Sequence, residues 1–140
     1  MQRNKPIVGI TQGDSNGIGY EVIIKAISDP RILDFFTPVV YGSSKLFGFY
    51  KKTIPEIEQL DTNVISSAAD AKPKRINILN CLPENVFAEP GQATPESAKA
   101  AITALAKAVE DIKAGQIDVL VRLTASDYTY SITLESLPWL

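Results

Sequence analysis

Short apolar runs alternate along the chain with longer stretches whose apolar residues recur every three to four positions. The runs cover residues 7–11, 38–41, 76–80 and 119–123, with a shorter candidate at 64–65. Apolar runs of this length, bounded by glycine, proline or polar residues, are typical of strands buried on both faces of a sheet. We therefore interpret each run as a β-strand.

The longer stretches have the helical period. They predict helices over residues 19–28, 43–52 (with Ser43 as its N-cap) and 94–114, and a short helical turn over 31–36. In the longest helix Thr94 is the expected N-cap, and Gly115 ends the helix. Five residues are predicted to form its inward stripe: Ile102, Leu105, Ala106, Val109 and Ile112.

Strands that alternate with helices predict a three-layer α/β fold with a doubly wound parallel sheet. The chain has 140 residues, which is enough for one domain with a substantial core. Its net charge of −2 argues against nucleic acid or an anionic membrane as a partner. No apolar stretch approaches the length of a membrane span, so we expect a cytoplasmic protein.

The most informative stretch is the glycine-rich loop between the first strand and the first helix. Glycines there allow close approach to a ligand, and the helix that follows offers free N–H groups to an anion. The spacing is not G-x-G-x-x-G, because Gly13 and Gly17 are four residues apart, and no Gly-Lys-Ser/Thr follows. A plain turn and a ligand site both account for the loop. We predict that Gly17 or Gly19 has a positive φ or packs too tightly for a Cβ.

Polar residues of this loop each have a functional and a structural interpretation. Asp14 is able to bind ligand hydroxyl groups or to stabilise the bend as an Asx-turn. The amides of Gln12 and Asn16 are able to reach a phosphate or ribose, or to cap the loop. Glu21 is better explained by the first helical turn, where a negative charge is favourable, than by a cleft.

Nucleophilic catalysis is not supported by the composition. The chain has no histidine, so neither a serine nor the single cysteine, Cys81, has an imidazole base. Cys81 lies in an apolar run, and we interpret it as a buried, reduced structural residue.

Residues 10–21, Ile-Thr-Gln-Gly-Asp-Ser-Asn-Gly-Ile-Gly-Tyr-Glu, resemble the amino-terminal signature of the 4-hydroxythreonine-4-phosphate dehydrogenase family of vitamin B6 synthesis. That signature is Thr-x-Gly-Asp-Pro-Ala-Gly-Ile-Gly-Pro-Glu, so Ser15, Asn16 and Tyr20 depart from it. The similarity continues through Val39–Ser43 and from Gly91 to Val121. Residues 1–121 are accordingly expected to form the family's amino-terminal α/β domain.

The resemblance implies a first domain like that of isocitrate and isopropylmalate dehydrogenases, incomplete in this chain. It also implies a homodimeric, NAD-dependent enzyme that oxidises and decarboxylates 4-phospho-hydroxy-L-threonine with a divalent metal ion. The positions carried over as a cofactor-facing loop are Gly13, Asp14, Gly17, Ile18 and Gly19. No catalytic or metal-binding residue carries over, because no histidine is present, and the chain alone is expected to be inactive.

Residues 122–140 form an atypical tail that we expect to be out of the family's reading frame. In place of Thr-Ala-Pro-Ile-Asn-Lys the chain continues from Arg122, which would enter a central buried strand as an unpaired charge. The last four residues can be encoded so that reading one base later gives Phe-Pro-Gly, a family segment. Such a tail would pack irregularly or stay mobile and favour aggregation. A genuine divergent ending is the alternative.

Two functional interpretations remain open. The chain is either the amino-terminal piece of such a dehydrogenase (or of an isopropylmalate or isocitrate dehydrogenase-like enzyme) or a non-catalytic α/β module that binds a nucleotide or phosphate.

Overall fold

The computed structural model describes residues 5–54 and 60–123. Its five strands are β1 (Ile7–Thr11), β2 (Thr37–Gly42), β3 (Thr62–Ile65), β4 (Ile76–Asn80) and β5 (Val119–Arg122). Its helices are α1 (Gly19–Ile27), α2 (Ser44–Lys51) and α3 (Pro95–Lys113), with 3₁₀ turns η1 (Pro30–Asp34) and η2 (Ala68–Asp70). The expected atypical tail lies outside the described residues, apart from its first two positions.

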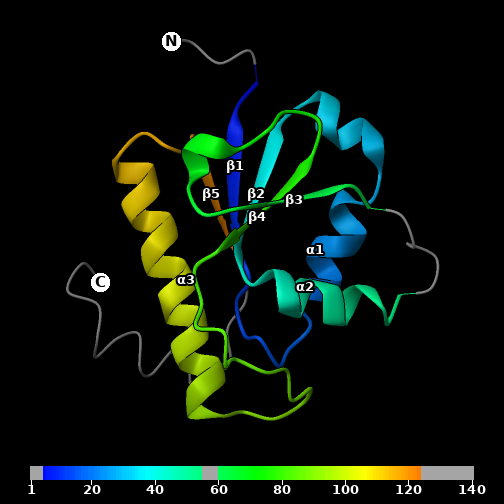
Figure 1. Ribbon diagram of the computed structural model, residues 1–140, viewed down its shortest axis with the longest axis vertical. Helices are drawn as coiled ribbons and strands as arrows, with labels where there is room; N and C mark the ends of the chain where they lie inside the picture. Colours follow the sequence, from blue (N-terminus) through cyan, green and yellow to red (C-terminus); the bar gives the residue numbers. More distant parts are fainter. Residues whose placement is uncertain (1–4, 55–59, 124–140) are drawn as a thin grey trace.

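The strands form one parallel sheet in the order β3-β4-β2-β1-β5. Helices α1 and α2 cover one face and α3 covers the other (Figure 1). The predicted doubly wound, three-layer fold is therefore confirmed. The chain winds outward from β1 to β2 and returns to place β5 on the other side of β1, so the strand order reverses at β1.

Each face of the sheet has its own apolar core. Beneath α1 and α2 the core includes Tyr20, Ile24 and Phe47, all at most 2% exposed. Beneath α3 it includes Tyr41 and Ile117, with similar burial. Because parallel strands must be covered on both faces, the two cores together stabilise the sheet.

Helix α3 begins as predicted, but it packs through different residues. Thr94 is the N-cap: its Oγ1 accepts a hydrogen bond from the Ser97 backbone N–H (3.1 Å), and Gly115 beyond the helix has φ +76°. The buried side consists of Ser97, Ala98, Ala100, Ala101, Ala104, Leu105, Ala108 and Asp111. Of the predicted stripe only Leu105 is fully buried, and the other four are half-buried. The prediction followed the large apolar residues, whereas the helix approaches the sheet through short alanine side chains.

The expectation for Arg122 was wrong. Within the described residues β5 is the edge strand, and Arg122 is exposed there. Its charge consequently remains in water and incurs no burial cost. In the described part of the chain, no helix has the length and apolar character needed to cross a membrane.

Candidate functional site

The glycine-rich loop follows β1 at the carboxyl end of the sheet, where the strand order reverses. The Gln12 backbone N–H donates to the Tyr41 carbonyl oxygen (3.1 Å), which extends the contact with β2 one residue past the strand. Gly13 then takes φ +71°, a conformation that favours glycine. In open α/β sheets ligands bind beyond the carboxyl ends of the strands, at such a reversal. The fold therefore places the loop where a ligand is expected.

Asp14 performs the structural role considered for it. Its Oδ1 accepts a hydrogen bond from the Asn16 backbone N–H (2.9 Å), which is an Asx-turn. Its carbonyl oxygen accepts one from the Gly17 N–H (3.1 Å). Asp14 is half-buried, so the carboxylate both orders the loop and faces its outer surface.

The two later glycines of the loop differ in their surroundings. A Cβ at Gly19 would overlap the Gln12 carbonyl oxygen, so the predicted tight packing is confirmed there. A Cβ at Gly17 would meet its nearest neighbour, the Asp14 Cβ, at 3.4 Å, which is an ordinary contact. Neither glycine has the positive φ, which belongs to Gly13 instead. Ile18, between them, is 71% exposed.

Asn16 joins this loop to a second loop, and no pattern in the sequence predicts that the two lie side by side. Its Nδ2 donates to the Gln92 carbonyl oxygen (2.9 Å), and its Oδ1 accepts from the Glu89 N–H (2.7 Å). The Asn16 carbonyl oxygen also accepts from the Gly91 N–H (2.9 Å). These bonds hold the segment before α3 against the loop. Asn16 is buried and therefore acts as a loop cap.

Beneath the loop, Gln12 belongs to a buried polar cluster. The Tyr20 hydroxyl donates to Gln12 Oε1 and accepts from the Ser43 N–H (3.0 Å). The ring of Tyr20 stacks on Tyr50, with 5.5 Å between centroids, and the Tyr50 hydroxyl donates to the Ser15 carbonyl oxygen (2.5 Å). Burial raises the pKa of Tyr20, so its hydroxyl stays protonated and able to donate.

Two buried polar atoms of this cluster have no hydrogen-bond partner among the described residues. They are Gln12 Nε2 and Ser15 Oγ, and both side chains are fully buried. Unsatisfied buried groups are rare, and they are found where a water molecule or a ligand completes the site. These two atoms are the strongest structural sign that the loop forms part of a ligand site as well as a turn.

The beginning of α1 also differs from that of the other two helices. Its N-cap position, Ile18, makes no side-chain hydrogen bond to the first turn, whereas Ser43 caps α2 and Thr94 caps α3. Glu21 pairs with Lys25 (2.9 Å) on the exposed side of α1, which supports the helical interpretation of this glutamate. The first N–H groups of α1 are thus without a side-chain cap, a setting that favours an anion.

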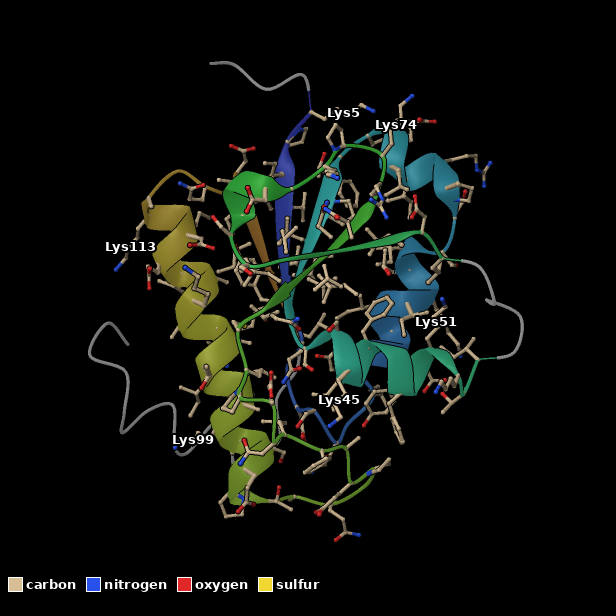
Figure 2. All side chains as sticks on the ribbon, viewed as in Figure 1. Lys5, Lys45, Lys51, Lys74, Lys99 and Lys113 are labelled. Carbon is tan, nitrogen blue, oxygen red and sulfur yellow. The ribbon has the colours of Figure 1, made fainter. Side chains whose placement is uncertain are left out.

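Two of the cavities lined by described residues lie at the carboxyl end of the sheet. One, of about 280 Å³, lies between the 83–94 segment and α3, and Glu89, Thr94 and Lys99 contribute to its wall. The other, of about 450 Å³, lies at the ends of β2 and β4 and includes Ser43 and Lys45. Figure 2 shows Lys45 and Lys99 at this end of the sheet, and the Lys45 ammonium lies 4.5 Å from the centre of the Phe87 ring. A larger cavity of about 600 Å³ lies at the amino ends of the strands, away from the loop.

Cys81 and the acidic residues do not supply further chemistry. Cys81 is half-buried rather than fully buried, and burial raises the pKa of its thiol to about 12, which disfavours a nucleophilic thiolate. Within residues 5–54 and 60–123 no group of three or more histidine, cysteine, aspartate or glutamate side chains is placed to hold a metal ion. The described residues therefore offer no set of ligands for the metal ion that the family resemblance implies.

A family model described as "Pyridoxal phosphate biosynthetic protein PdxA" matches residues 34–129. The match continues eight residues beyond the boundary expected at residue 121, into the expected out-of-frame tail. A curated 4-hydroxythreonine-4-phosphate dehydrogenase from Bacteroides thetaiotaomicron is 40% identical over 129 residues. That alignment covers 92% of this chain and 35% of the relative.

Solved structures show the same fold. A 4-hydroxythreonine-4-phosphate dehydrogenase from Burkholderia phymatum superposes with a TM-score of 0.79 at 22% identity, covering 92% of this chain and 39% of that one. The enzyme of the same name from Klebsiella pneumoniae gives a TM-score of 0.79 at 19% identity, and the superposition covers 96% of this chain and 42% of that one. The chain thus spans between a third and a half of the length of these proteins.

Proposed function

The chain belongs to the family of the pyridoxal phosphate biosynthetic protein PdxA, and we propose that it forms the cofactor-facing part of a dehydrogenase of vitamin B6 synthesis. The whole enzyme would oxidise 4-phospho-hydroxy-L-threonine with NAD and then decarboxylate it, as a homodimer. The proposal is supported by the match over residues 34–129 and by the relatives, which are dehydrogenases.

Within this function we assign the glycine-rich loop to the cofactor. Asp14, Gly17 and Ile18 form its outer surface and would contact NAD, whereas Gly13 and Gly19 are buried and set the backbone path. The observation that carries the assignment is the pair of unsatisfied buried atoms, Gln12 Nε2 and Ser15 Oγ, beneath this surface. When bound, NAD supplies the hydride acceptor. The residues of the loop bind and orient it.

A second candidate function is favoured by the loop itself. The chain has a glycine loop that leads into a helix N-terminus without a side-chain cap. These two features suit a phosphate group without any catalysis. We therefore keep a non-catalytic nucleotide- or phosphate-binding module as the alternative.

The test is a titration of the 140-residue chain with NADH, followed by nicotinamide fluorescence. We expect saturable binding, and we expect Asp14→Asn to weaken it about tenfold, which corresponds to about 1.4 kcal/mol. Asparagine retains an oxygen that accepts the Asn16 N–H, so the turn survives while the charge is removed. Glu21→Gln on the exposed side of α1 is the matched control and should leave binding unchanged.

The outcomes separate the candidates. Competition by inorganic phosphate and ADP, with no preference for the nicotinamide half, would favour the binding module. Saturable binding of NADH that Asp14→Asn does not weaken would indicate that the cofactor binds elsewhere than at the loop. No binding of NADH, ADP or phosphate would contradict both functions and leave the loop with its structural role alone.

A further inference from the structure

The segment between β4 and α3 is held in place by few contacts. Residues 83–94 (the strap) form no helix or strand, and none of these residues is buried. Two of them, Val86 and Ala88, pack against the core beneath α1 and α2. In Figure 1 the strap leads to the start of α3 and lies beside the blue loop that follows β1. A segment with so few buried groups opens more readily than the sheet does.

Asn16 provides the hydrogen bonds that join the strap to the glycine-rich loop. Among the described residues, every hydrogen bond from residues 83–92 to another segment ends on Asn16. Its side chain accepts from the Glu89 N–H (2.7 Å) and donates to the Gln92 carbonyl oxygen (2.9 Å). Its carbonyl oxygen accepts from the Gly91 N–H (2.9 Å). Asn16 is 3% exposed, so water has little access to replace these bonds.

On its other side, Asn16 is oriented by the residue that we assign to the cofactor. The Asn16 backbone N–H donates to Asp14 Oδ1 (2.9 Å), so the carboxylate fixes the backbone from which the Asn16 side chain extends. Asp14 and the strap are thus joined through a single residue. The family signature has alanine at this position, and alanine has no polar side-chain atom with which to hold the strap.

The strap also contributes to both cavities at the carboxyl end of the sheet. Phe87 and Glu89 line the cavity of about 280 Å³, and Pro83 lines both this cavity and the one of about 450 Å³. The Phe87 ring is 64% exposed, and the Lys45 ammonium of α2 lies 4.5 Å from its centre. A displacement of the strap therefore changes the shape of both cavities.

We propose that Asn16 is a positioning residue that couples the two loops, so that a dinucleotide bound at the glycine-rich loop also holds the strap against it. The inference rests on the assignment of NAD to that loop. A ligand that contacts Asp14 binds the turn in the orientation that Asn16 stabilises, whereas opening of the strap removes the bonds that stabilise it. The ligand consequently favours the closed strap.

Amide hydrogen exchange of the ligand-free 140-residue chain, followed by NMR at Glu89 and Gly91, tests the first half of the proposal. Asn16→Ala should raise exchange at both amides about tenfold, because two side-chain hydrogen bonds are lost. Gly91 reports on the strap as a whole, since its own bond to the Asn16 carbonyl oxygen does not involve the substituted side chain.

Two further variants make this comparison specific. Asn16→Asp keeps the oxygen that accepts from Glu89 and loses the donor to Gln92, so it should raise exchange less than Asn16→Ala does. Asn85→Ala is the matched control, because Asn85 is an exposed residue of the strap whose side chain makes no hydrogen bond among the described residues. It should leave both exchange rates unchanged.

The coupling to the loop is tested from the ligand's side. Asp14→Ala removes the acceptor that orients Asn16 and should also raise exchange at Glu89 and Gly91. NADH at ten times its Kd should lower exchange at these amides by about tenfold in the wild type. It should lower exchange much less in Asn16→Ala, although nicotinamide fluorescence should still show binding.

The outcomes distinguish this inference from the proposed function. If NADH does not bind, the proposed function fails, and the ligand-free comparison of Asp14→Ala with wild type still decides whether the loop and the strap are coupled. Bound NADH that leaves exchange in the wild-type strap unchanged would overturn the coupling while the proposed function stands. Unchanged exchange in ligand-free Asn16→Ala would overturn the proposal outright. If Asn16→Ala does not fold, the comparison of Asn16→Asp with wild type takes its place.

Discussion

At the scale of single residues, the loop after β1 depends on close packing as much as on backbone freedom. Gly13 provides the positive φ, and Gly19 allows the first turn of α1 to approach the Gln12 carbonyl oxygen. Gly17 does neither, although the sequence pattern makes it look equivalent to Gly19. The sequence indicates that glycines are needed here, but only the three-dimensional path shows which one meets a neighbouring backbone.

This difference gives a matched pair of substitutions. Gly19→Ala should lower the free energy of unfolding by about 1–3 kcal/mol, because the Cβ overlaps a backbone oxygen that cannot rotate away. Gly17→Ala should change it by less than about 0.5 kcal/mol. Urea denaturation followed by circular dichroism measures both. Equal losses in the two variants would contradict the packing described for Gly19.

At the scale of elements, helix ends were predictable and buried faces were less so. Ser43, Thr94 and Gly115 mark helix ends by local hydrogen bonding and backbone conformation, which depend on neighbouring residues alone. The buried face of α3 depends instead on what the sheet presents to it. The contact from Asn16 to the 89–94 segment joins residues more than seventy positions apart, and no local pattern encodes it.

The cap of α3 is the prediction at this scale. Thr94→Ala removes the oxygen that accepts the Ser97 N–H and should lower the free energy of unfolding by about 1 kcal/mol. Thr103→Ala is the matched control: Thr103 lies within the same helix, and its Oγ1 donates to the Lys99 carbonyl oxygen (2.8 Å) rather than accepting from a helix N-terminal N–H. Chemical denaturation of the two variants should separate them, and an effect of Thr103→Ala as large as that of Thr94→Ala would refute the capping role.

At the scale of the whole molecule, two apolar cores are separated by one sheet, and among the described helices α3 covers the second core. This helix is joined to the sheet by a buried hydrogen bond from the Tyr41 hydroxyl to Oδ2 of Asp111 (2.6 Å). Lys107 lies 3.1 Å from the other carboxylate oxygen, at the edge of the buried region. The buried charge of Asp111 is thus compensated from both sides, which a buried carboxylate requires.

Removing the Tyr41 hydroxyl tests this connection between the layers. Tyr41→Phe should lower the free energy of unfolding at pH 7 by about 1–3 kcal/mol, because a hydrogen bond to a charged acceptor is lost while Asp111 stays buried. Asp111→Asn keeps an oxygen that accepts from the Tyr41 hydroxyl, so it should lower the free energy of unfolding less than Asp111→Ala does. Urea denaturation of the three variants measures these differences.

The same residue gives the stability a specific dependence on alkaline pH. Burial, and then the bond to Asp111, raises the pKa of Tyr41 in the folded state, whereas an unfolded tyrosine titrates near pH 10. A raised pKa means that the contribution is fully present below about pH 10 and is lost as the pH rises above it, because only the unfolded chain releases the proton. The free energy of unfolding of the wild type should therefore decrease above pH 10, and that of Tyr41→Phe should decrease less steeply. The pKa values of Tyr20 and Tyr50 are also raised by burial, so the Tyr41→Phe variant should still lose some stability above pH 10.

Urea denaturation at several pH values above and below 10 measures how the free energy of unfolding depends on pH. Parallel pH dependences for wild type and Tyr41→Phe would show that the fold does not protect Tyr41 from ionisation.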